Sequence, residues 1–305
     1  MPMPRLPLEF TAEQRYAIDL HMHSTASDGA LTPTELVNLC AERGLRYMAL
    51  SDHDTMDGVA EAGEAARQAG ITLVPASELS TRWQGINIHV VALMPGGLRG
   101  PLVEGLQQQR KSRIARGEVI AERLEKLGLE NALAKAREQA GSERPLGRPD
   151  FAKAMVAAGM VADLATAFKR YLGSGKRGDV KAHWPEIGQA VEWIVESGGV
   201  AVLAHPMRHG LTRRKRGLLM DGFREAGGQA VELVSGYQNP DATRDLARQL
   251  GERELYASMG SDFHFPGGHL APGSMSPLPR TQTLPIWRHP RLQHLDAAPP
   301  GPLSL

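Results

Sequence analysis

Nine side chains of the kinds that bind divalent cations stand where strands are expected to end. Six are histidines and three are carboxylates: His21, His23, Asp28, His53, Glu78, His89, His205, Asp262 and His264. Borderline divalent cations prefer imidazole and carboxylate ligands, and two or three ions held close together need about this many donors. A single ion would leave many donors unused. The residue types and their number therefore indicate a multinuclear metallo-hydrolase.

The first cluster begins as a strand. Side chains alternate in extended backbone, so His21 and His23 lie on one face together with Asp19 and can converge on one ion. Asp19, Asp52 and Asp54 each lie close to a candidate ligand histidine in the sequence. A carboxylate in that position often accepts the second ring proton of a metal-bound histidine, and we expect this role for all three rather than direct binding.

The remaining ligands follow short apolar runs that have the pattern of strands, separated by helical segments. Thr32 is a candidate N-cap with Pro33 at the first helical position, and this helix is expected to end at Gly44. Similar helical segments run over 58–70, 187–198, 218–227 and 241–251. Repeated strand–helix units with ligands at the carboxyl ends of the strands predict an α/β barrel, with an open doubly wound sheet as the alternative.

Residues 101–177 interrupt this alternation with helical periodicity and predict a small helical cap over the barrel. The basic run 110–116 within it fits a solvated helix face as well as a phosphate contact. The expected organisation is a barrel over 16–100 and 178–290, a cap insertion over 101–177, and poorly ordered tails at 1–15 and 291–305.

The composition, net charge and cysteine count are those of an ordinary globular protein. The chain of 305 residues is 42% hydrophobic and 23% charged, which is ordinary for a globular protein with a sizeable core. Its net charge is +1, from 35 basic and 34 acidic residues, so affinity for nucleic acid must come from local patches. The single cysteine, Cys40, excludes an intramolecular disulfide and is expected to be a buried, unreactive thiol.

No apolar run is long enough to span a membrane, and the amino terminus lacks the apolar region of a signal peptide. We therefore expect a cytoplasmic protein without a membrane partner, and no obligate protein partner is evident. His183, His209 and His269 lie apart from the motifs and are expected at the surface. Of the three, His183 is the best candidate for a functional role instead.

The motifs resemble those of the polymerase and histidinol phosphatase (PHP) family. The resemblance covers about 16–100 and 178–290, and it implies a distorted (β/α) barrel of seven strands. It is carried by Asp19-Leu20-His21-Met22-His23-Ser24, Ser51-Asp52-His53-Asp54 and Gly260-Ser261-Asp262-Phe263-His264. Gly147-Arg148-Pro149, Ala204-His205-Pro206 and Pro285-Ile286-Trp287 make the chain most similar to the 3′,5′-nucleotide bisphosphate phosphatases, whose relatives include 5′-to-3′ exoribonucleases.

The resemblance also implies how the nine ligands are shared. His21, His23, Glu78 and Asp262 would hold one metal, and Glu78 would bridge to a second metal held by His89 and His205. Asp28, His53 and His264 would hold a third. Two or three divalent ions are therefore expected, with Mn²⁺ first and Mg²⁺, Fe²⁺ or Zn²⁺ as alternatives. Glu78, Asp262 and His205 are the residues expected to carry catalysis.

Basic residues outside the ligand set are candidates for binding substrate. Arg148 and Arg208 could each bind a phosphate through the guanidinium fork, and Lys181 could assist. Asp150 departs from the histidine usual in the bisphosphatases and could weaken one phosphate contact. The run 213–216 is expected to be a solvated loop that could favour longer nucleic-acid substrates.

The function expected from the resemblance is metal-dependent removal of the 3′-phosphate from 3′,5′-bisphosphonucleosides. Short RNA, degraded from the 5′ end, is a second expected substrate. Two alternatives remain open from the sequence. One is a phosphatase of another small phosphomonoester such as histidinol phosphate, and the other is a non-catalytic PHP module associated with a polymerase, which the complete ligand set disfavours.

Overall fold

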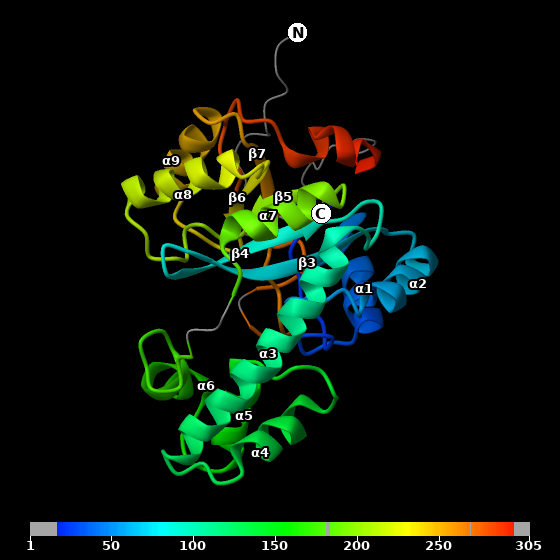
Figure 1. The fold of residues 1–305 in the computed structure, drawn as a ribbon. Coiled ribbons are helices and arrows are strands. Elements are labelled where there is room, and N and C mark those ends of the chain that lie inside the picture. The colour runs from blue at the N-terminus through cyan, green and yellow to red at the C-terminus, as the bar shows by residue number, and fades with distance from the viewer. Residues whose placement is uncertain (1–16, 181–183, 269, 296–305) are drawn as a thin grey trace. The chain divides into compact units, whose positions relative to one another are not determined.

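The computed structural model describes residues 17–180, 184–268 and 270–295 and divides the chain into two compact units (Figure 1). The barrel unit comprises Met1–Gly105 and Pro185–Leu305, and the helical unit comprises Leu106–Trp184. Expected features in 1–15, at Lys181 and His183, at His269 and beyond 295 lie outside the described residues. Among the helices of the described ranges, none has the length and apolar character needed to cross a membrane.

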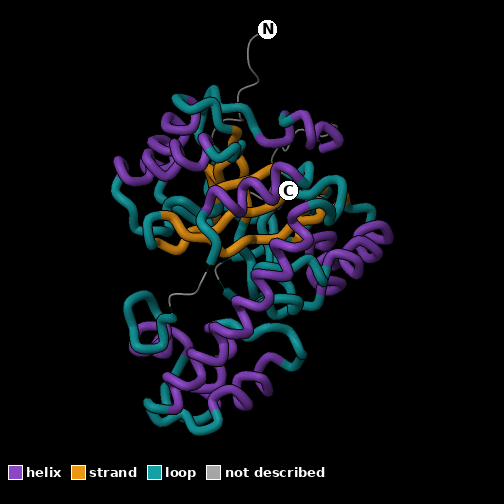
Figure 2. Tube along the Cα trace, in the orientation of Figure 1, coloured by secondary structure: helices purple, strands orange, loops and turns teal. Residues whose placement is uncertain are grey.

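In the described part of the chain, seven strands form one sheet in which neighbours along the chain are neighbours in space (Figure 2). They are β1 (Ile18–Asp19), β2 (Tyr47–Leu50), β3 (Thr72–Trp83), β4 (Ile86–Leu93), β5 (Val200–Leu203), β6 (Ala230–Ser235) and β7 (Tyr256–Gly260). The pairs β1–β2, β2–β3, β5–β6 and β6–β7 are parallel. Strands β3 and β4 pair antiparallel, as do β4 and β5.

The two ends of the sheet meet and nearly close it into a barrel. Leu20 N donates to Met259 O at 3.2 Å, and beyond the strands His23 N donates to Phe263 O at 3.0 Å. A sheet whose first and last strands are hydrogen-bonded has no open edge at that point. The prediction of an α/β barrel is therefore confirmed, and the open doubly wound alternative is wrong.

The antiparallel hairpin of β3 and β4 differs from the expected regular strand–helix repeat. Gln84 and Gly85 connect the two strands and both have positive φ, 49° and 77°, the conformation of a two-residue hairpin turn. Glu78 and His89 consequently lie inside long strands rather than at strand ends. Two apolar runs separated by two residues ending in glycine were a hairpin signal that the strand–helix interpretation overlooked.

Helices cover the barrel and fill the helical unit. The α-helices are α1 (Pro33–Glu42), α2 (Val59–Ala69), α3 (Pro101–Glu125), α4 (Ala132–Ala140), α5 (Arg148–Ala157), α6 (Leu164–Ala167), α7 (Ile187–Glu196), α8 (Arg213–Glu225) and α9 (Pro240–Gly251). A π-helix, η1 (Phe168–Leu172), and two 3₁₀ helices, η2 (Ile286–Arg288) and η3 (Pro290–Leu295), complete the elements of the described residues. The division between the units falls within α3.

Local sequence signals account for most helix starts. Thr32 caps α1 through a capping box with Glu35, and Pro33 is the first helical residue, as predicted. Helix α8 begins earlier than expected because Thr212 accepts a hydrogen bond from Lys215 N, so the run 213–216 is a helical turn and not a loop. Helix η3 lies in the expected carboxyl-terminal tail, where Leu292 is fully buried.

Each unit has its own apolar core. In the barrel unit, Met22, Leu36 and Phe263 belong to a cluster between the first strands and helices α1 and α2, and Cys40 is fully buried there, as predicted. In the helical unit, a second cluster contains Leu124 of α3 together with residues of α4 to α6. Each fully buried side chain of leucine size stabilises the fold by about 1.5–3 kcal/mol, so these clusters hold the backbone that positions the polar residues.

Candidate metal centre

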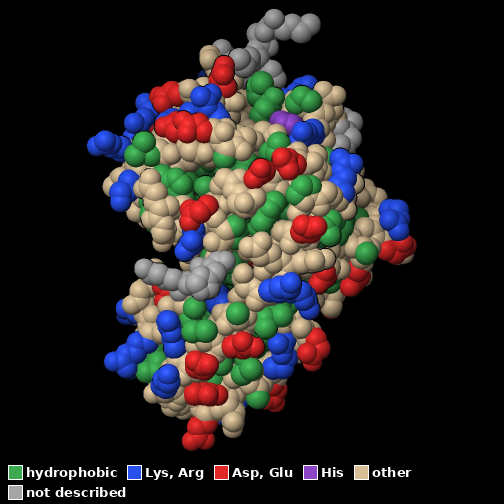
Figure 3. Space-filling view, in the orientation of Figure 1, with side chains coloured by type: hydrophobic (Ala, Val, Ile, Leu, Met, Phe, Trp, Pro, Cys, Tyr) green, Lys and Arg blue, Asp and Glu red, His purple; other side chains and the backbone are tan. Residues whose placement is uncertain are grey.

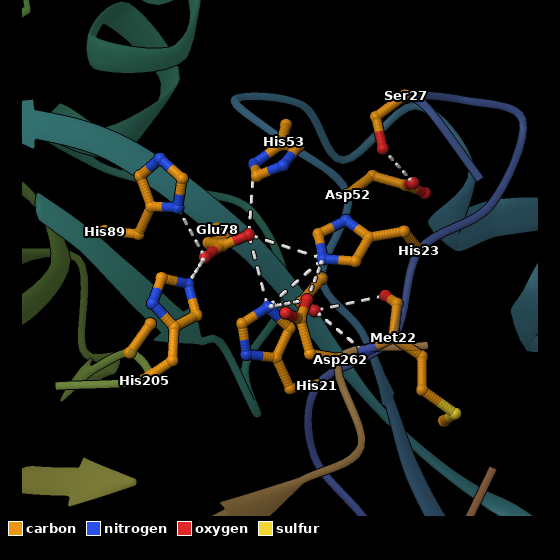
Figure 4. Close-up of polar contacts among 12 residues, drawn as sticks. His21, Met22, His23, Ser27, Asp52, His53, Glu78, His89, His205 and Asp262 are labelled. Atoms are coloured by element: carbon orange, nitrogen blue, oxygen red, sulfur yellow. Dashed lines mark hydrogen bonds and ion pairs between the residues drawn. The ribbon is translucent and has the colours of Figure 1, made fainter. Parts of the chain in front are cut away.

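Glu78 of β3 lies at the centre of a cluster of histidines and carboxylates in the barrel unit (Figure 4). Its side chain is completely buried. Glu78 Oε1 is 2.8 Å from both His89 Nδ1 and His205 Nε2. Glu78 Oε2 is 3.2 Å from His21 Nε2, 3.3 Å from His23 Nε2 and 3.0 Å from His53 Nδ1.

The structure brings all nine sequence-predicted ligands to this centre. Three groups have potential ligand atoms within 4.8 Å of one another. They are His21, His23, Glu78 and Asp262; His53, Glu78 and His89; and His23, Asp28, His53 and His264. His205 belongs to the centre through Glu78 Oε1. His23 and His53 each occur in two groups, whereas the expected assignment placed each of them at one metal only.

Alternation along the first strand orients its two histidines as predicted. His21 and His23 are completely buried and face the cluster, whereas Met22 between them packs into the apolar core. Gly260, at the end of β7, allows this close approach, because a Cβ at that position would lie 2.2 Å from the Cβ of His21. Any larger residue at position 260 would push His21 out of place.

Two of the ligands adopt strained backbone conformations. His205 has a φ of 29° and Asp262 a φ of 57°, values that cost a residue with a side chain about 1–3 kcal/mol each. Hydrogen bonds offset this cost, because His205 N donates to Glu232 Oε2 at 2.7 Å and Asp262 N donates to His21 O at 2.8 Å. The loops after β5 and β7 are thus held in the turns that aim both side chains at the cluster around Glu78.

The electrostatics of the centre favour positive charge. Burial raises the pKa of the Glu78 carboxyl, but the surrounding imidazoles outweigh burial and hold that pKa well below its usual value. Burial lowers the pKa of His23, yet its contacts with Asp262 and Glu78 raise that pKa to about 10. Asp262 behaves like Glu78, since neighbouring histidines outweigh burial and lower its pKa. A divalent cation would satisfy this demand for positive charge in place of protons.

The donor set fits divalent metals on geometric grounds as well. Glu78 Oε2 is buried and accepts no hydrogen bond within the described part of the chain, although imidazole nitrogens surround it. A buried carboxylate oxygen without a donor is costly unless a cation binds it. His21 Nε2 and His23 Nε2 are only 3.1 Å apart, the separation expected of two nitrogens aimed at a common ion.

Glu232 is a residue of the site that the sequence interpretation missed. It is buried in β6, and its Oε1 lies 2.5 Å from His21 Nδ1 while its Oε2 accepts from His205 N. The ring proton of His21 is therefore held at Nδ1, which leaves Nε2 available as a ligand. A glutamate inside the apolar run 230–234 was the signal that could have identified it.

Replacing Glu232 by glutamine should weaken metal binding about 10- to 100-fold, the usual cost of removing a partner that orients a ligand histidine. Isothermal titration of the metal-free protein measures this affinity. Glu225→Gln, on the exposed surface of α8, is the matched control and should bind metal like the wild type. Unchanged affinity in Glu232→Gln, with cooperative thermal unfolding retained, would show that His21 is oriented by packing alone.

The three aspartates expected to support ligand histidines make other contacts. Asp19 accepts hydrogen bonds from the backbone N–H groups of His21, Ser261 and Gly273. Burial raises its pKa to about 6, against the effect of these donors. Asp52 accepts from the hydroxyls of Ser24 and Ser27. These carboxylates fix the loops that carry the ligands, so the expected contact to a ring proton is wrong for Asp19 and Asp52.

Asp54 likewise contacts backbone, since its Oδ1 accepts from Ser80 N at 2.6 Å. His209 also departs from expectation. It was expected at the surface, but it is partly buried against His205, with ring centroids 5.2 Å apart, and its Nε2 lies 3.2 Å from Ala204 O. Burial lowers the pKa of His209 to about 3, so its ring is neutral. His209 thus supports the strained turn at His205.

The candidate substrate-binding residues are in different parts of the chain. Arg208 lies at the metal centre, where its Nη1 contacts Asp262 Oδ2 and its Nη2 donates to Ser235 O. Arg148 lies in the helical unit at the start of α5, and its Nη1 donates to Leu172 O at 3.2 Å. Lys181 lies outside the described residues.

Asp150 has a structural partner that removes its expected influence on phosphate. It is completely buried, and both of its oxygens accept from Arg144, at 2.7 and 2.9 Å. Its Oδ2 also accepts from Gly147 N at the start of α5. A carboxylate neutralised by a bidentate arginine presents little negative charge to a ligand. The expectation that Asp150 could weaken a phosphate contact is therefore not supported by its surroundings.

Comparison with known proteins identifies the family. A 5′-3′ exoribonuclease from Haemophilus influenzae is 41% identical to this chain, over 88% of this chain and 97% of the relative. The PHP domain family matches residues 19–136. This chain belongs to the PHP family. The expected resemblance is thereby confirmed.

Other members of the PHP family agree in sequence and fold. A 3′,5′-nucleoside bisphosphate phosphatase from Chromobacterium violaceum is 39% identical over 89% of this chain and 95% of the relative. A solved structure of an amidohydrolase from the same organism has a TM-score of 0.84 and 38% identity, covering 91% of this chain and 96% of that one. A protein from Bifidobacterium adolescentis, assigned as a metal-dependent phosphoesterase, has a TM-score of 0.76 and 25% identity, covering 86% and 92%.

Proposed function

We propose that this chain is a metal-dependent phosphoesterase that removes the 3′-phosphate of 3′,5′-bisphosphonucleosides and also degrades short RNA from its 5′ end. The observation that carries the proposal is the convergence of nine nitrogen and oxygen donors around the buried Glu78. This centre occurs in a chain similar over most of its length to a bisphosphate phosphatase and an exoribonuclease. Both activities hydrolyse phosphoric esters, which is chemistry that a multinuclear centre supports.

Two or three divalent ions, with Mn²⁺ first, are proposed as the cofactors. His21, His23, Glu78 and Asp262 would hold one, and Glu78, His89 and His205 a second; Asp28, His53 and His264 would hold a third. When bound, such ions act as Lewis acids on the phosphate and lower the pKa of water. Glu78 and Asp262 supply the negative charge that retains the ions, and Glu232 keeps His21 and His205 oriented.

Arg208 is proposed to bind the phosphate that is hydrolysed. Its side chain is 41% exposed while its Nη1 contacts Asp262, so the guanidinium reaches the metal centre and remains accessible. A guanidinium donates in a planar fork that matches two phosphate oxygens. Charge developing on the phosphate would therefore be stabilised by a donor that is already in place.

Arg148 is proposed to bind the second phosphate of a 3′,5′-bisphosphonucleoside, with Lys181 assisting. The Arg148 guanidinium is held by Leu172 O and lies 6.0 Å from the centre of the Phe168 ring. A side chain fixed in this way loses little conformational entropy when it binds an anion. The reacting 3′-phosphate would then be bound at the metal centre.

The proposal is tested by phosphate release from a panel of phosphomonoesters with added Mn²⁺. The panel contains a 3′,5′-bisphosphonucleoside, a 5′-mononucleotide, histidinol phosphate and a simple aryl phosphate, and 5′-phosphorylated short RNA is assayed for release of mononucleotides. We expect the highest kcat/KM for the bisphosphonucleoside. A preference for histidinol phosphate would reassign the substrate, and no release from any compound would contradict the enzymatic function.

Replacing Arg148 by alanine should raise KM for the bisphosphonucleoside more than for the simple ester. Removing a charge-assisted hydrogen bond costs about 1.5–3 kcal/mol, roughly ten- to a hundredfold in kcat/KM. The simple ester lacks the second phosphate and should be less affected. Arg148→Lys keeps the positive charge but lacks the guanidinium fork. Its kcat/KM for the bisphosphonucleoside should lie between those of the wild type and Arg148→Ala. Equal losses on both substrates would assign Arg148 to holding the fold at Leu172 O.

A further inference from the structure

The two units of the chain carry opposite net charge. The helical unit, 106–184, contains 16 lysines and arginines and 9 aspartates and glutamates, a net charge of +7 with neutral histidines. The remainder of the chain contains 19 basic and 25 acidic residues, a net charge of −6. The overall charge of +1 conceals this separation. A strongly cationic unit in a chain that is nearly neutral overall is typical of a surface that binds a polyanion.

Much of the exposed positive charge is concentrated in one segment, 168–178, called here the basic loop. Its cationic side chains are Lys169, Arg170, Lys176 and Arg177, and all four are exposed. Within the described ranges, none of the four forms an ion pair with a carboxylate. Lys and Arg side chains gather around α6, which immediately precedes the loop (Figure 3). Their charge is therefore available to a ligand.

The backbone of the basic loop is held firmly within the helical unit. It begins as the π-helix η1, a rare element that is frequent at functional sites. Gly173 N donates to Phe168 O at 2.8 Å and Gly178 N to Tyr171 O at 2.7 Å, so the loop closes on itself. Arg123 of α3 donates to Asp179 O at 2.8 Å and secures its far end. A loop fixed in this way presents its cations without a large ordering cost.

Aromatic rings alternate with cations in the same segment. The Arg170 guanidinium carbon lies 5.6 Å from the centre of the Tyr171 ring, and both Tyr171 and Phe168 are only partly buried. Single-stranded nucleic acids bind surfaces that combine backbone-neutralising cations with rings or guanidinium planes on which bases can stack. Anionic membranes would need cations but not aromatic faces held at these positions. The combination favours RNA over other polyanions.

We propose that the basic loop binds phosphates of single-stranded RNA. The inference rests on the proposed function in that it takes RNA as a substrate of the enzyme. The two phosphates of a bisphosphonucleoside are assigned to Arg208 and Arg148, so this substrate has none left for the four cations of the loop. The loop therefore gives long substrates an advantage in KM that small substrates lack.

The experiment compares matched pairs of charge-neutralising substitutions in the full-length, metal-loaded enzyme. The loop variant carries Arg170→Gln and Lys176→Gln, and a fourfold variant adds Lys169→Gln and Arg177→Gln. The control carries Arg46→Gln and Arg280→Gln, which remove two exposed positive charges from the barrel unit. All of these side chains are exposed, so cooperative thermal unfolding should be retained in every variant.

In the fourfold variant, kcat/KM for a single-stranded RNA of about ten nucleotides should fall at least about tenfold at 0.1 M salt. The slope of log affinity against log salt should become shallower by about 0.7 for each phosphate that the variant no longer neutralises. Hydrolysis of the bisphosphonucleoside should stay within about twofold of wild type, because the substitutions leave the proposed ligands, Arg208 and Arg148 unchanged. The control pair should leave both activities unchanged.

Binding of a non-hydrolysable 2′-O-methyl oligonucleotide, followed by fluorescence anisotropy, tests the surface separately from catalysis. If the enzyme hydrolyses no RNA but the loop variants still weaken oligonucleotide binding, the proposed RNA substrate fails and the RNA-binding surface stands. Unchanged binding in the fourfold variant would overturn the inference. So would an equal loss in the control with Arg46→Gln and Arg280→Gln, or tighter binding of anionic vesicles than of the oligonucleotide.

Discussion

Glu78→Gln should lose more than about a hundredfold in kcat while the protein remains folded. Substituting a residue that only supports a metal ligand lowers metal affinity or activity about 10- to 100-fold. Removing the charge of the central carboxylate should have a larger effect. Both oxygens of Glu78 are surrounded by imidazoles, Oε1 by His89 and His205 and Oε2 by His21 and His23 among others. Loss of its charge therefore disturbs every part of the centre at once.

Steady-state kinetics at saturating Mn²⁺, together with metal analysis of the purified variant, measure this effect. The charge-matched control is again Glu225→Gln, which removes a carboxylate charge from the exposed surface of α8. It should keep wild-type turnover and metal content. Circular dichroism and thermal unfolding separate loss of the centre from loss of the fold. Turnover of Glu78→Gln close to wild type would contradict a central role for this carboxylate.

Removal of metal by chelation should abolish hydrolysis, and added Mn²⁺, Mg²⁺, Fe²⁺ or Zn²⁺ should restore it to different extents. The centre mixes imidazole nitrogens and carboxylate oxygens, a set of donors that does not select one of these ions. Metal should also raise the thermal midpoint, since a ligand at about a hundred times its Kd stabilises the folded state by about 2.7 kcal/mol.

Elemental analysis and activity must be measured on the same preparation. Full activity with less than one bound ion per chain would contradict the metal-dependent mechanism. The variant with Arg46→Gln and Arg280→Gln is a useful comparison, because its substitutions replace no proposed ligand and should leave metal content unchanged. A rise in thermal midpoint on adding metal that disappears in Glu78→Gln would assign the stabilisation to this centre.

The sequence by itself determined the donors and the family. His21 and His23 share a face because strand side chains alternate, and this property is local to a few residues. The signal for the helix beginning at Pro33 was also local, since its capping box involves only Thr32 and Glu35. Short motifs such as Ser51-Asp52-His53-Asp54 were sufficient for the family because their chemistry does not depend on distant parts of the chain.

Tertiary structure decided which distant groups meet. Glu232 contacts His21 across 211 residues of sequence, and no local pattern links the two. The pairing of β4 with β5 places His89 and His205 on the same oxygen of Glu78, although the helical unit separates those strands in the chain. Asp150 resembled a free acidic group in the sequence, but Arg144 neutralises it in the fold. Long-range contacts of this kind depend on how whole elements pack, which sequence periodicity does not encode.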